Sequence, residues 1–197
     1  MTNKTYLIAL VSLIAGVGAG YLLWGNANTI SFPTTHMMSN GTVMIQGIDR
    51  HFIEEMIPHH EGAIAMAKIA LTRSKRQEIR TLANDIIEAQ EKESADMKSW
   101  YQSWFGSAVP ETSGSMSMMH MGSVAGDTEI LESIAAADFD REFLKEMIPH
   151  HEMAVMMGEM LQAATERAEM KQLADNIIAS QSREIQIMRG WLASWAE

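Results

Sequence analysis

The chain has 197 residues, of which 47% are hydrophobic, and its formal net charge is −10 at pH 7. This length fits one ordinary domain or two small ones, and an acidic chain repels the phosphates of nucleic acid, so we expect no nucleic-acid partner. The absence of cysteine excludes disulfides, thiolate metal sites and dithiol redox chemistry. Against this stand 18 methionines, whose thioether sulfur is a soft metal ligand.

The first segment, residues 1–28, is expected to be a signal peptide or a membrane anchor. A run of 19 residues without a charge extends from Tyr6 to Trp24, a length that fits either a secretory signal or a membrane-spanning helix. The small residues Gly25-Asn26-Ala27 suit signal peptidase. Lys4 favours a cytoplasmic N-terminus. The rest of the chain is therefore expected to be periplasmic or secreted, with this segment in contact with the membrane.

An internal repeat dominates the remainder of the chain. The heptapeptide EMIPHHE at residues 55–61 returns letter for letter at residues 146–152, 91 positions later. Aligned without a gap, residues 49–104 and 140–195 share 24 identities in 56 positions. A fixed internal period indicates one structural unit used twice. Because a Met–His–Glu cluster repeats most strictly, we expect a duplicated site as well as a duplicated scaffold.

Each copy predicts two long helices. In the first helix Asp49 is the expected N-cap. On a helical wheel His59 faces the core and His60 lies at the edge of the core face. Pro58 and Pro149 are expected to kink or restart the first helix of each copy. The second helices carry matching packing stripes with a Gln and a Glu in the middle. These stripes are Leu82, Ile86, Gln90, Glu93, Met97, Trp100 and Trp104, and Leu173, Ile177, Gln181, Glu184, Met188, Trp191 and Trp195.

Two such helical hairpins predict an all-α four-helix bundle, preceded by the hydrophobic export or anchor helix. The first hairpin is expected at residues 49–105 and the second at residues 129–197. Residues 29–48 and 106–128 are rich in Ser, Thr, Gly and Pro, a composition typical of loops. Both of these expected loops contain methionine and histidine.

The methionines and histidines indicate a soft metal ion. Thioether and imidazole ligands without thiolates suit Cu(I), with Ag(I) as a chemical surrogate, whereas Zn(II) and Fe favour thiolates, carboxylates or more imidazoles. A single methionine on a core stripe is more simply explained by core packing. The loop methionines differ, because a Ser- and Gly-rich segment has no means of burying them. For those residues a protein partner is the alternative to a metal.

The candidate metal ligands fall into two helical and two loop groups. In the first repeat they are Met56, His59, His60 and Met66. In the second repeat they are Met147, His150, His151, Met153, Met156, Met157 and Met160. The loop groups are His36, Met37, Met38 and Met44, and Met116, Met118, Met119, His120 and Met121. We expect the loop groups to capture ions first or to close over the helical sites.

The carboxylates keep two other functions open. Glu93 and Glu184 are expected to hold an imidazole, either behind a metal site or as structural hydrogen-bond partners. A ferritin-like di-iron centre needs Glu-x-x-His, but methionine stands three residues before His59 and His150. A carboxylate–histidine metalloenzyme and a b-type haem electron-transfer bundle remain the alternatives. The chain shows no phosphate-binding loop or nucleophile–base constellation, so we expect a protein that is not an enzyme.

Within each histidine pair the two residues are expected to have different roles. The inner residues, His59 and His150, should serve a buried polar network with the glutamates of the seam, where an unsatisfied partner is costly. The outer residues, His60 and His151, should meet a metal that arrives from solvent.

The motif Met56-Ile57-Pro58-His59-His60, followed by Ala and Met at helical spacing, resembles the ferritin-like CopM family. These exported helical-bundle proteins carry the same motif, were long of unknown function, and include a copper-resistance protein of cyanobacteria. The resemblance covers nearly the whole chain. It implies a ferritin-like bundle that sequesters or buffers Cu(I) outside the cytoplasm for copper resistance and homeostasis. Copper-efflux or copper-sensor proteins are then candidate partners.

Overall fold

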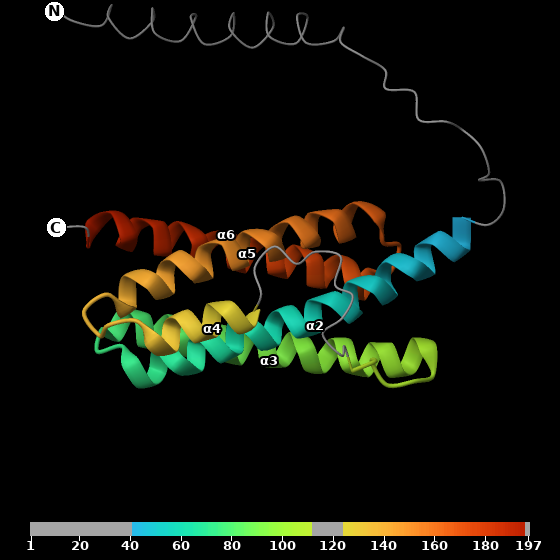
Figure 1. The fold of residues 1–197 in the computed structure, drawn as a ribbon. Helices are drawn as coiled ribbons and strands as arrows, with labels where there is room; N and C mark the ends of the chain where they lie inside the picture. The colour runs from blue at the N-terminus through green and yellow to red at the C-terminus, as the bar shows by residue number, and fades with distance from the viewer. Residues whose placement is uncertain (1–40, 112–123, 196–197) are drawn as a thin grey trace, which may run out of the picture. The chain divides into compact units, whose positions relative to one another are not determined.

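The computed structural model describes residues 41–111 and 124–195, which are largely helical. The helices are α2 (Gly41–Arg73), α3 (Gln77–Phe105), α4 (Val124–Ser133), α5 (Phe139–Ala164) and α6 (Ala168–Ser194). Helices α2 and α3 form one hairpin, α5 and α6 form the other, and α2 packs against α5 (Figure 1). The predicted all-α bundle of two hairpins is confirmed.

None of the helices within residues 41–111 and 124–195 is both long and apolar enough to cross a membrane. The segment expected to be a signal or anchor, residues 1–28, lies outside the described residues.

The two hairpins turn in the same way. Three residues, 74–76 in one and 165–167 in the other, connect their helices. The Ser74 hydroxyl accepts a hydrogen bond from the backbone N–H of Arg76 at 3.1 Å, and the Thr165 hydroxyl accepts one from Arg167 at 3.2 Å. A side-chain acceptor here satisfies a donor that the following helix leaves free. The internal repeat therefore extends to the detail of its turns.

Two predicted loop boundaries are wrong. Helix α2 begins at Gly41, so residues 41–48 are helical and Asp49 lies inside the helix rather than at its N-cap. Residues 124–128, expected to be linker, form the start of α4. Both stretches contain Gly and Thr, which typically indicate loops in a sequence, and neither belongs to the repeat.

Helix α4 is held by the end of α2. The Arg73 guanidinium donates to the backbone carbonyls of Glu132 at 2.9 Å and Ile134 at 2.6 Å, and also to that of Leu131. Carbonyls at a helix C-terminus lack intrahelical donors and favour a cation. Leu131 is also fully buried in the core. These tertiary contacts stabilise a ten-residue helix that would be marginal alone.

Neither proline restarts its helix, which was one of the two expected outcomes. Helix α2 continues through Pro58, and α5 continues through Pro149. A proline removes one hydrogen bond of the helix, at a cost of about 3 kcal/mol. Each helix buries apolar residues on both sides of its proline, and this packing outweighs the loss.

A polar layer divides the apolar core into two clusters. One contains Phe139, Phe143 and the second half of α2, and the other contains Phe52, Tyr101 and the first half of α2. On each long helix the polar residues come between the two clusters. The buried members of the layer are His60, Gln90, Ser94, His150, His151 and Gln181. Buried polar groups destabilise a fold unless they are hydrogen-bonded, so this layer calls for a functional explanation.

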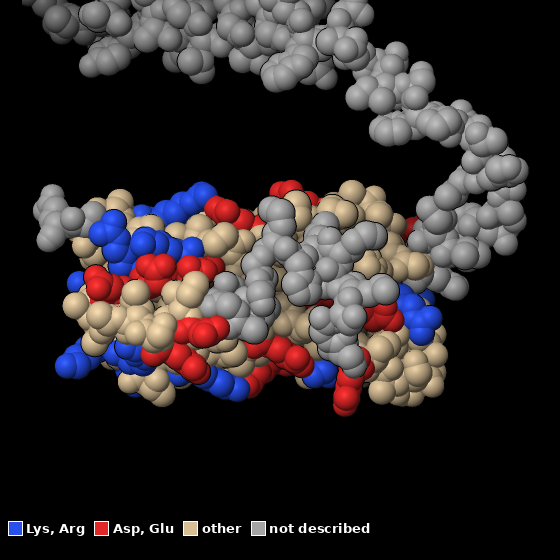
Figure 2. Space-filling view, viewed as in Figure 1, with Lys and Arg blue, Asp and Glu red and all other residues tan. Residues whose placement is uncertain are grey.

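The described surface, by contrast, carries mixed charge and exposed ion pairs. Acidic and basic side chains are interspersed on the face shown in Figure 2. Lys68 pairs with Glu91 and Lys98 with Glu61, each at 3.6 Å and with both partners exposed. Such pairs contribute less than about 1 kcal/mol each. The described residues that are visible on this face therefore carry both charges.

Candidate metal centre

One histidine of each pair faces the partner helix of its own hairpin. His60 Nε2 lies 2.9 Å from Glu93 Oε2, and His151 Nε2 lies 2.7 Å from Glu184 Oε2. Both imidazoles are fully buried, while the glutamates reach the surface. Because a carboxylate accepts here, we assign the ring proton to Nε2, which leaves the lone pair on Nδ1. Glu93 and Glu184 therefore each hold an imidazole, as predicted.

The other histidine of each pair faces the opposite hairpin. The rings of His59 and His150 are in contact, with centroids 3.8 Å apart and planes tilted by 41°. These residues occupy equivalent positions of the two repeats, on α2 and α5. All four of their ring nitrogens are buried, and none has a hydrogen-bond partner among the described residues. An unpaired buried polar group costs about 1–3 kcal/mol, so this contact is unfavourable in the absence of a ligand.

The predicted division of roles within the pairs is therefore wrong. The histidines expected to bind the glutamates, His59 and His150, contact each other, and those expected at the edge, His60 and His151, are fully buried. The helical wheel assumed a single inner face. Helix α2 packs against both α3 and α5, so it buries two faces, with one histidine on each.

Burial keeps the contacting imidazoles neutral. It lowers the pKa of His59 to about 3, and the neighbouring His60 and His151 act in the same direction. Burial likewise lowers the pKa of His150 well below its ordinary value, with further contributions from the other three histidines. A neutral imidazole offers a lone pair without first losing a proton. Near neutral pH both residues are therefore available as metal ligands.

The four imidazoles form one cluster at the centre of the bundle. The ring centroids of His59 and His60 are 6.5 Å apart, and those of His150 and His151 are 6.4 Å apart. The Nδ1 atoms of His60 and His151 are also buried without a partner, which brings the unpaired ring nitrogens to six. Within the described part of the chain, no three His, Asp or Glu side chains are arranged to hold a metal ion.

The structure separates the predicted helical methionines into two kinds. Three are fully buried in the apolar core: Met56, Met66 and Met147. Four lie on one flank of α5 with graded exposure: Met153, Met156, Met157 and Met160. Core packing is sufficient to explain the first kind. The second kind has the solvent access that an arriving metal ion needs.

Most of the predicted loop ligands lie outside the described residues. These are His36, Met37, Met38, Met116, Met118, Met119, His120 and Met121. Met44 was assigned to a loop, but its backbone belongs to α2.

A reciprocal contact that was not predicted from the sequence joins the two hairpins. Arg167 Nε lies 3.0 Å from Asp49 Oδ2, and its guanidinium lies 4.1 Å from the ring centroid of Trp104. The equivalent Arg76 pairs with Asp140 at 3.3 Å and stacks over the last tryptophan of the other hairpin, also at 4.1 Å. We call each set an arginine clasp. All three residue types are identical in the two repeats, which was the available signal.

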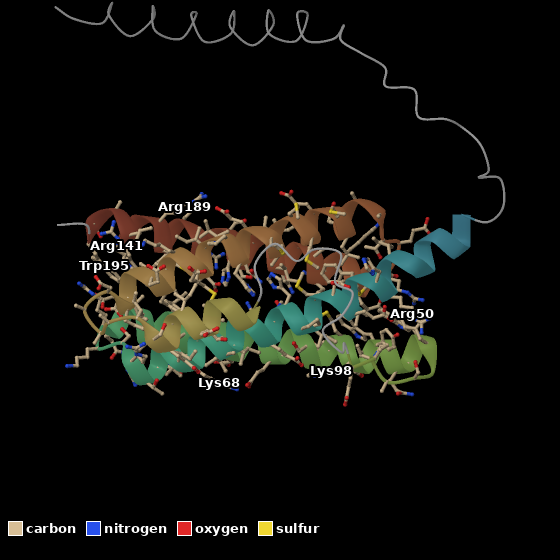
Figure 3. The ribbon with its side chains drawn as sticks, in the orientation of Figure 1. Arg50, Lys68, Lys98, Arg141, Arg189 and Trp195 are labelled. Carbon is tan, nitrogen blue, oxygen red and sulfur yellow. The ribbon has the colours of Figure 1, made fainter. Side chains whose placement is uncertain are left out.

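The arginine clasps lie at opposite ends of the bundle. Figure 3 shows Trp195, which belongs to one clasp, at one end and Arg50, the neighbour of Asp49 in the other clasp, at the opposite end. The histidine cluster lies midway along the helices, between the two halves of the core. The hairpins are thus fixed to each other on both sides of the His59–His150 contact.

The sequence pattern of a known family matches most of this fold. The family is DUF305, described as a domain of unknown function, and the match covers residues 49–192. The chain belongs to the DUF305 family. The matched region contains most of both hairpins, both arginines of the clasps and all four histidines of the cluster.

Solved structures of similar sequence share the fold. CopM in its Cu(I)-bound form is 46% identical, with a TM-score of 0.67, over 76% of this chain and 98% of that one. CopM in an Ag-bound form is 44% identical, with a TM-score of 0.65 and the same coverage. A DUF305 fragment from Deinococcus radiodurans is 31% identical, with a TM-score of 0.66, over 75% of this chain and 96% of that one. The predicted resemblance to the CopM family is confirmed.

A curated relative matches over a shorter stretch. The uncharacterized protein L153 of Acanthamoeba polyphaga mimivirus is 43% identical over 51 residues. The match covers 26% of this chain and 34% of the viral protein, so the chain spans about a third of that relative's length.

Proposed function

We propose that the protein binds Cu(I) without turnover and sequesters or buffers it outside the cytoplasm, for copper resistance and homeostasis. The observation that carries this proposal is the contact between His59 and His150. Two neutral imidazoles face each other with four buried nitrogens that have no hydrogen-bond partner among the described residues. Each neutral imidazole has one lone pair, and a soft ion with a low coordination number would satisfy the lone pair of each ring directly.

The charge of the site favours a monovalent ion. The carboxylates of Glu93 and Glu184 are hydrogen-bonded to His60 and His151. Neutral imidazoles give no charge compensation, and burying an ion without it costs more as the ionic charge rises. Cu(I) and Ag(I) therefore fit this donor set better than Zn(II) or Fe(II). The two glutamates would orient the Nδ1 lone pairs of their histidines toward the cluster, in the way that carboxylates hold metal-binding imidazoles.

The comparisons support the choice of metal. CopM, which is 46% identical to this chain, forms Cu(I)-bound and Ag-bound structures. The uncharged run from Tyr6 to Trp24 supports export or anchoring. We extend the proposal to a periplasmic or secreted location, to membrane contact through the N-terminal segment, and to copper-efflux or copper-sensor proteins as partners.

Anaerobic titration of the full chain with Cu(I) and Zn(II), followed by X-ray absorption, tests the proposal. The matched variant carries His59→Phe and His150→Phe, which keep ring shape and remove the lone pairs. Met170→Leu, in the buried core of α6, is the control. We expect tight Cu(I) binding, weak Zn(II) competition, and loss of one Cu(I) equivalent and its nitrogen scattering in the histidine variant only.

Other outcomes would contradict the proposal. Equal competition by Zn(II) would favour the carboxylate–histidine metalloenzyme. An intense Soret band in the purified protein would favour the haem-binding bundle, because Cu(I) itself is colourless. Unchanged Cu(I) stoichiometry in the histidine variant would move the site to the methionine groups.

A further inference from the structure

The proposed copper site is buried, so an ion needs a route between solvent and the histidines. On α5 the methionines continue the helical stripe that contains His150. Met153, Met157 and Met160 follow His150 at spacings of three, four and three residues. Together with Met156 they lie within about 120° of the helix circumference. Each step along the stripe is about 4.5–6 Å, a gap that neighbouring flexible methionine side chains can bridge.

Burial increases along this stripe toward the cluster. Met160 is 51% exposed and Met156 is 42% exposed. Met157 and Met153, one and two turns closer to the histidines, are half-buried. His150 is 9% exposed and carries two buried nitrogens without a partner among the described residues. The stripe therefore begins at the surface with the thioether of Met160. It ends at His150, whose ring nitrogens have no hydrogen-bond partner among the described residues.

The first hairpin has no such stripe. Its positions equivalent to Met153, Met156 and Met160 hold residues without a thioether: Gly62, Ala65 and Ile69. The equivalent of Met157 is Met66, which is fully buried in the core. The two hairpins thus supply matching histidines to the cluster, whereas among the side chains described in residues 47–111 and 128–195 the exposed methionines lie on α5.

We propose that Met160, Met156, Met157 and Met153 form a one-sided thioether path along α5 that passes Cu(I) between the surface and His150. This inference rests on the proposed function. Each step exchanges one neutral ligand for another, so the ion stays Cu(I) and no proton or electron is transferred. The path governs the rate of loading, and the histidines hold the ion at equilibrium.

Stopped-flow transfer of Cu(I) from a coloured chelator complex to the full chain, without oxygen, measures the loading rate. The phase that belongs to the cluster is the one that disappears in the His59→Phe, His150→Phe variant. The test variant carries Met153→Leu, Met156→Leu and Met160→Leu, which preserve apolar volume. Met170→Leu is the matched control away from the path. We expect the test variant to slow the histidine-dependent phase at least tenfold while its amplitude stays the same.

The outcomes separate the path from the site. An unchanged rate constant in the methionine variant would overturn the path and leave the proposed function standing. A loss of amplitude at unchanged rate would show that these methionines store the ion, which also overturns the path. The absence of any histidine-dependent phase in the wild-type protein would overturn the proposed function and the path together.

Discussion

The two hairpins share the residues that join them to each other but differ along one flank of their first helices. His59 meets His150, and the arginine of each turn pairs with an aspartate of the other hairpin. The first hairpin, however, has Gly62 and Ala65 at the positions where the second has exposed or half-buried methionines.

This difference has a geometric cause. Where two equivalent elements pack around a pseudo-two-fold axis, a residue near the axis contacts its own equivalent, as in an isologous dimer interface. A change in one copy alters the surroundings of its equivalent in the other copy, so the two copies must stay compatible. A solvent-facing flank has no such restriction. The residues shared at the contact therefore belong to the scaffold and its central site, and the methionines of α5 belong to a flank on which the two hairpins differ.

Among changes to the polar contacts, breaking either His–Glu pair should have the largest effect on stability. His60→Ala and His151→Ala each remove a fully buried ring and leave a partly buried carboxylate without its partner. We expect a loss of about 3 kcal/mol in the free energy of unfolding for each variant, and similar losses in the two hairpins. Urea denaturation of the apo protein measures this. Glu88→Ala, on the exposed surface of α3, is the control and should change stability by less than about 0.5 kcal/mol. A loss in only one hairpin would contradict their equivalence.

Acid should destabilise the protein through the contacting histidines. The pKa of His59 is lowered to about 3 in the folded protein, whereas an unfolded histidine titrates near 6.5. At pH values between these two pKa values the unfolded state therefore binds more protons than the folded state. The free energy of unfolding then falls as the pH drops below about 6.5. We expect about 1.4 kcal/mol per pH unit from this residue, with His150 acting in the same direction.

Urea denaturation at pH 7, 6 and 5 tests the acid effect. The His59→Phe, His150→Phe variant should show a shallower slope, because it retains the carboxylates but lacks the two titrating rings. Equal slopes in the two proteins would show that the histidine pair does not remain neutral in the fold.

The two arginine clasps should differ in strength despite their equivalence. Asp49 is fully buried and also accepts a hydrogen bond from the Thr165 hydroxyl at 2.6 Å. The side chain of Asp140 is 24% exposed, so water can replace part of its lost contact. We expect Arg167→Ala to cost about 2 kcal/mol and Arg76→Ala about 1 kcal/mol. Thermal unfolding of the two variants side by side gives the order, and the reverse order would contradict this explanation.

Changes to the exposed thioethers should have the smallest effect on stability. Met156→Leu and Met160→Leu keep apolar volume at positions that are 42% and 51% exposed. The free energy of unfolding should change by less than about 0.5 kcal/mol in each case. Met147→Ala, in the core, should cost about 2–5 kcal/mol in the same assay. A large loss from the exposed changes would mean that these methionines support packing.

Most of the fold could be predicted from the internal repeat. Identical residues at a fixed period predicted two equivalent hairpins, and the stripe through Gln90 and Glu93 predicted the polar layer in the seam. Helix α4 was not predictable in this way. Its stability comes from Arg73 and from burial of Leu131, contacts made by residues that are distant in sequence.

The four histidines of the cluster were named from the sequence, but their arrangement was not predicted. A helical wheel gives the angle between His59 and His60, about 100°, but not which neighbour each one faces. That depends on helix α2 packing against two other helices. Glu93 and Glu184 were correctly predicted to hold imidazoles. They were assigned to the inner histidines, whereas the structure pairs them with His60 and His151.

Silver offers the most direct test of the central claim, that His59 and His150 hold the metal ion. Natural silver consists of spin-½ nuclei, so Ag(I) bound to ¹⁵N-labelled imidazole produces a resolved coupling in the NMR spectrum of the histidine rings. Assignment by single His→Phe variants separates the seven histidines. We predict a silver coupling on a ring nitrogen of both His59 and His150 at the first equivalent bound by the cluster. Uncoupled, unshifted signals from these two residues in the silver-saturated protein would contradict the account.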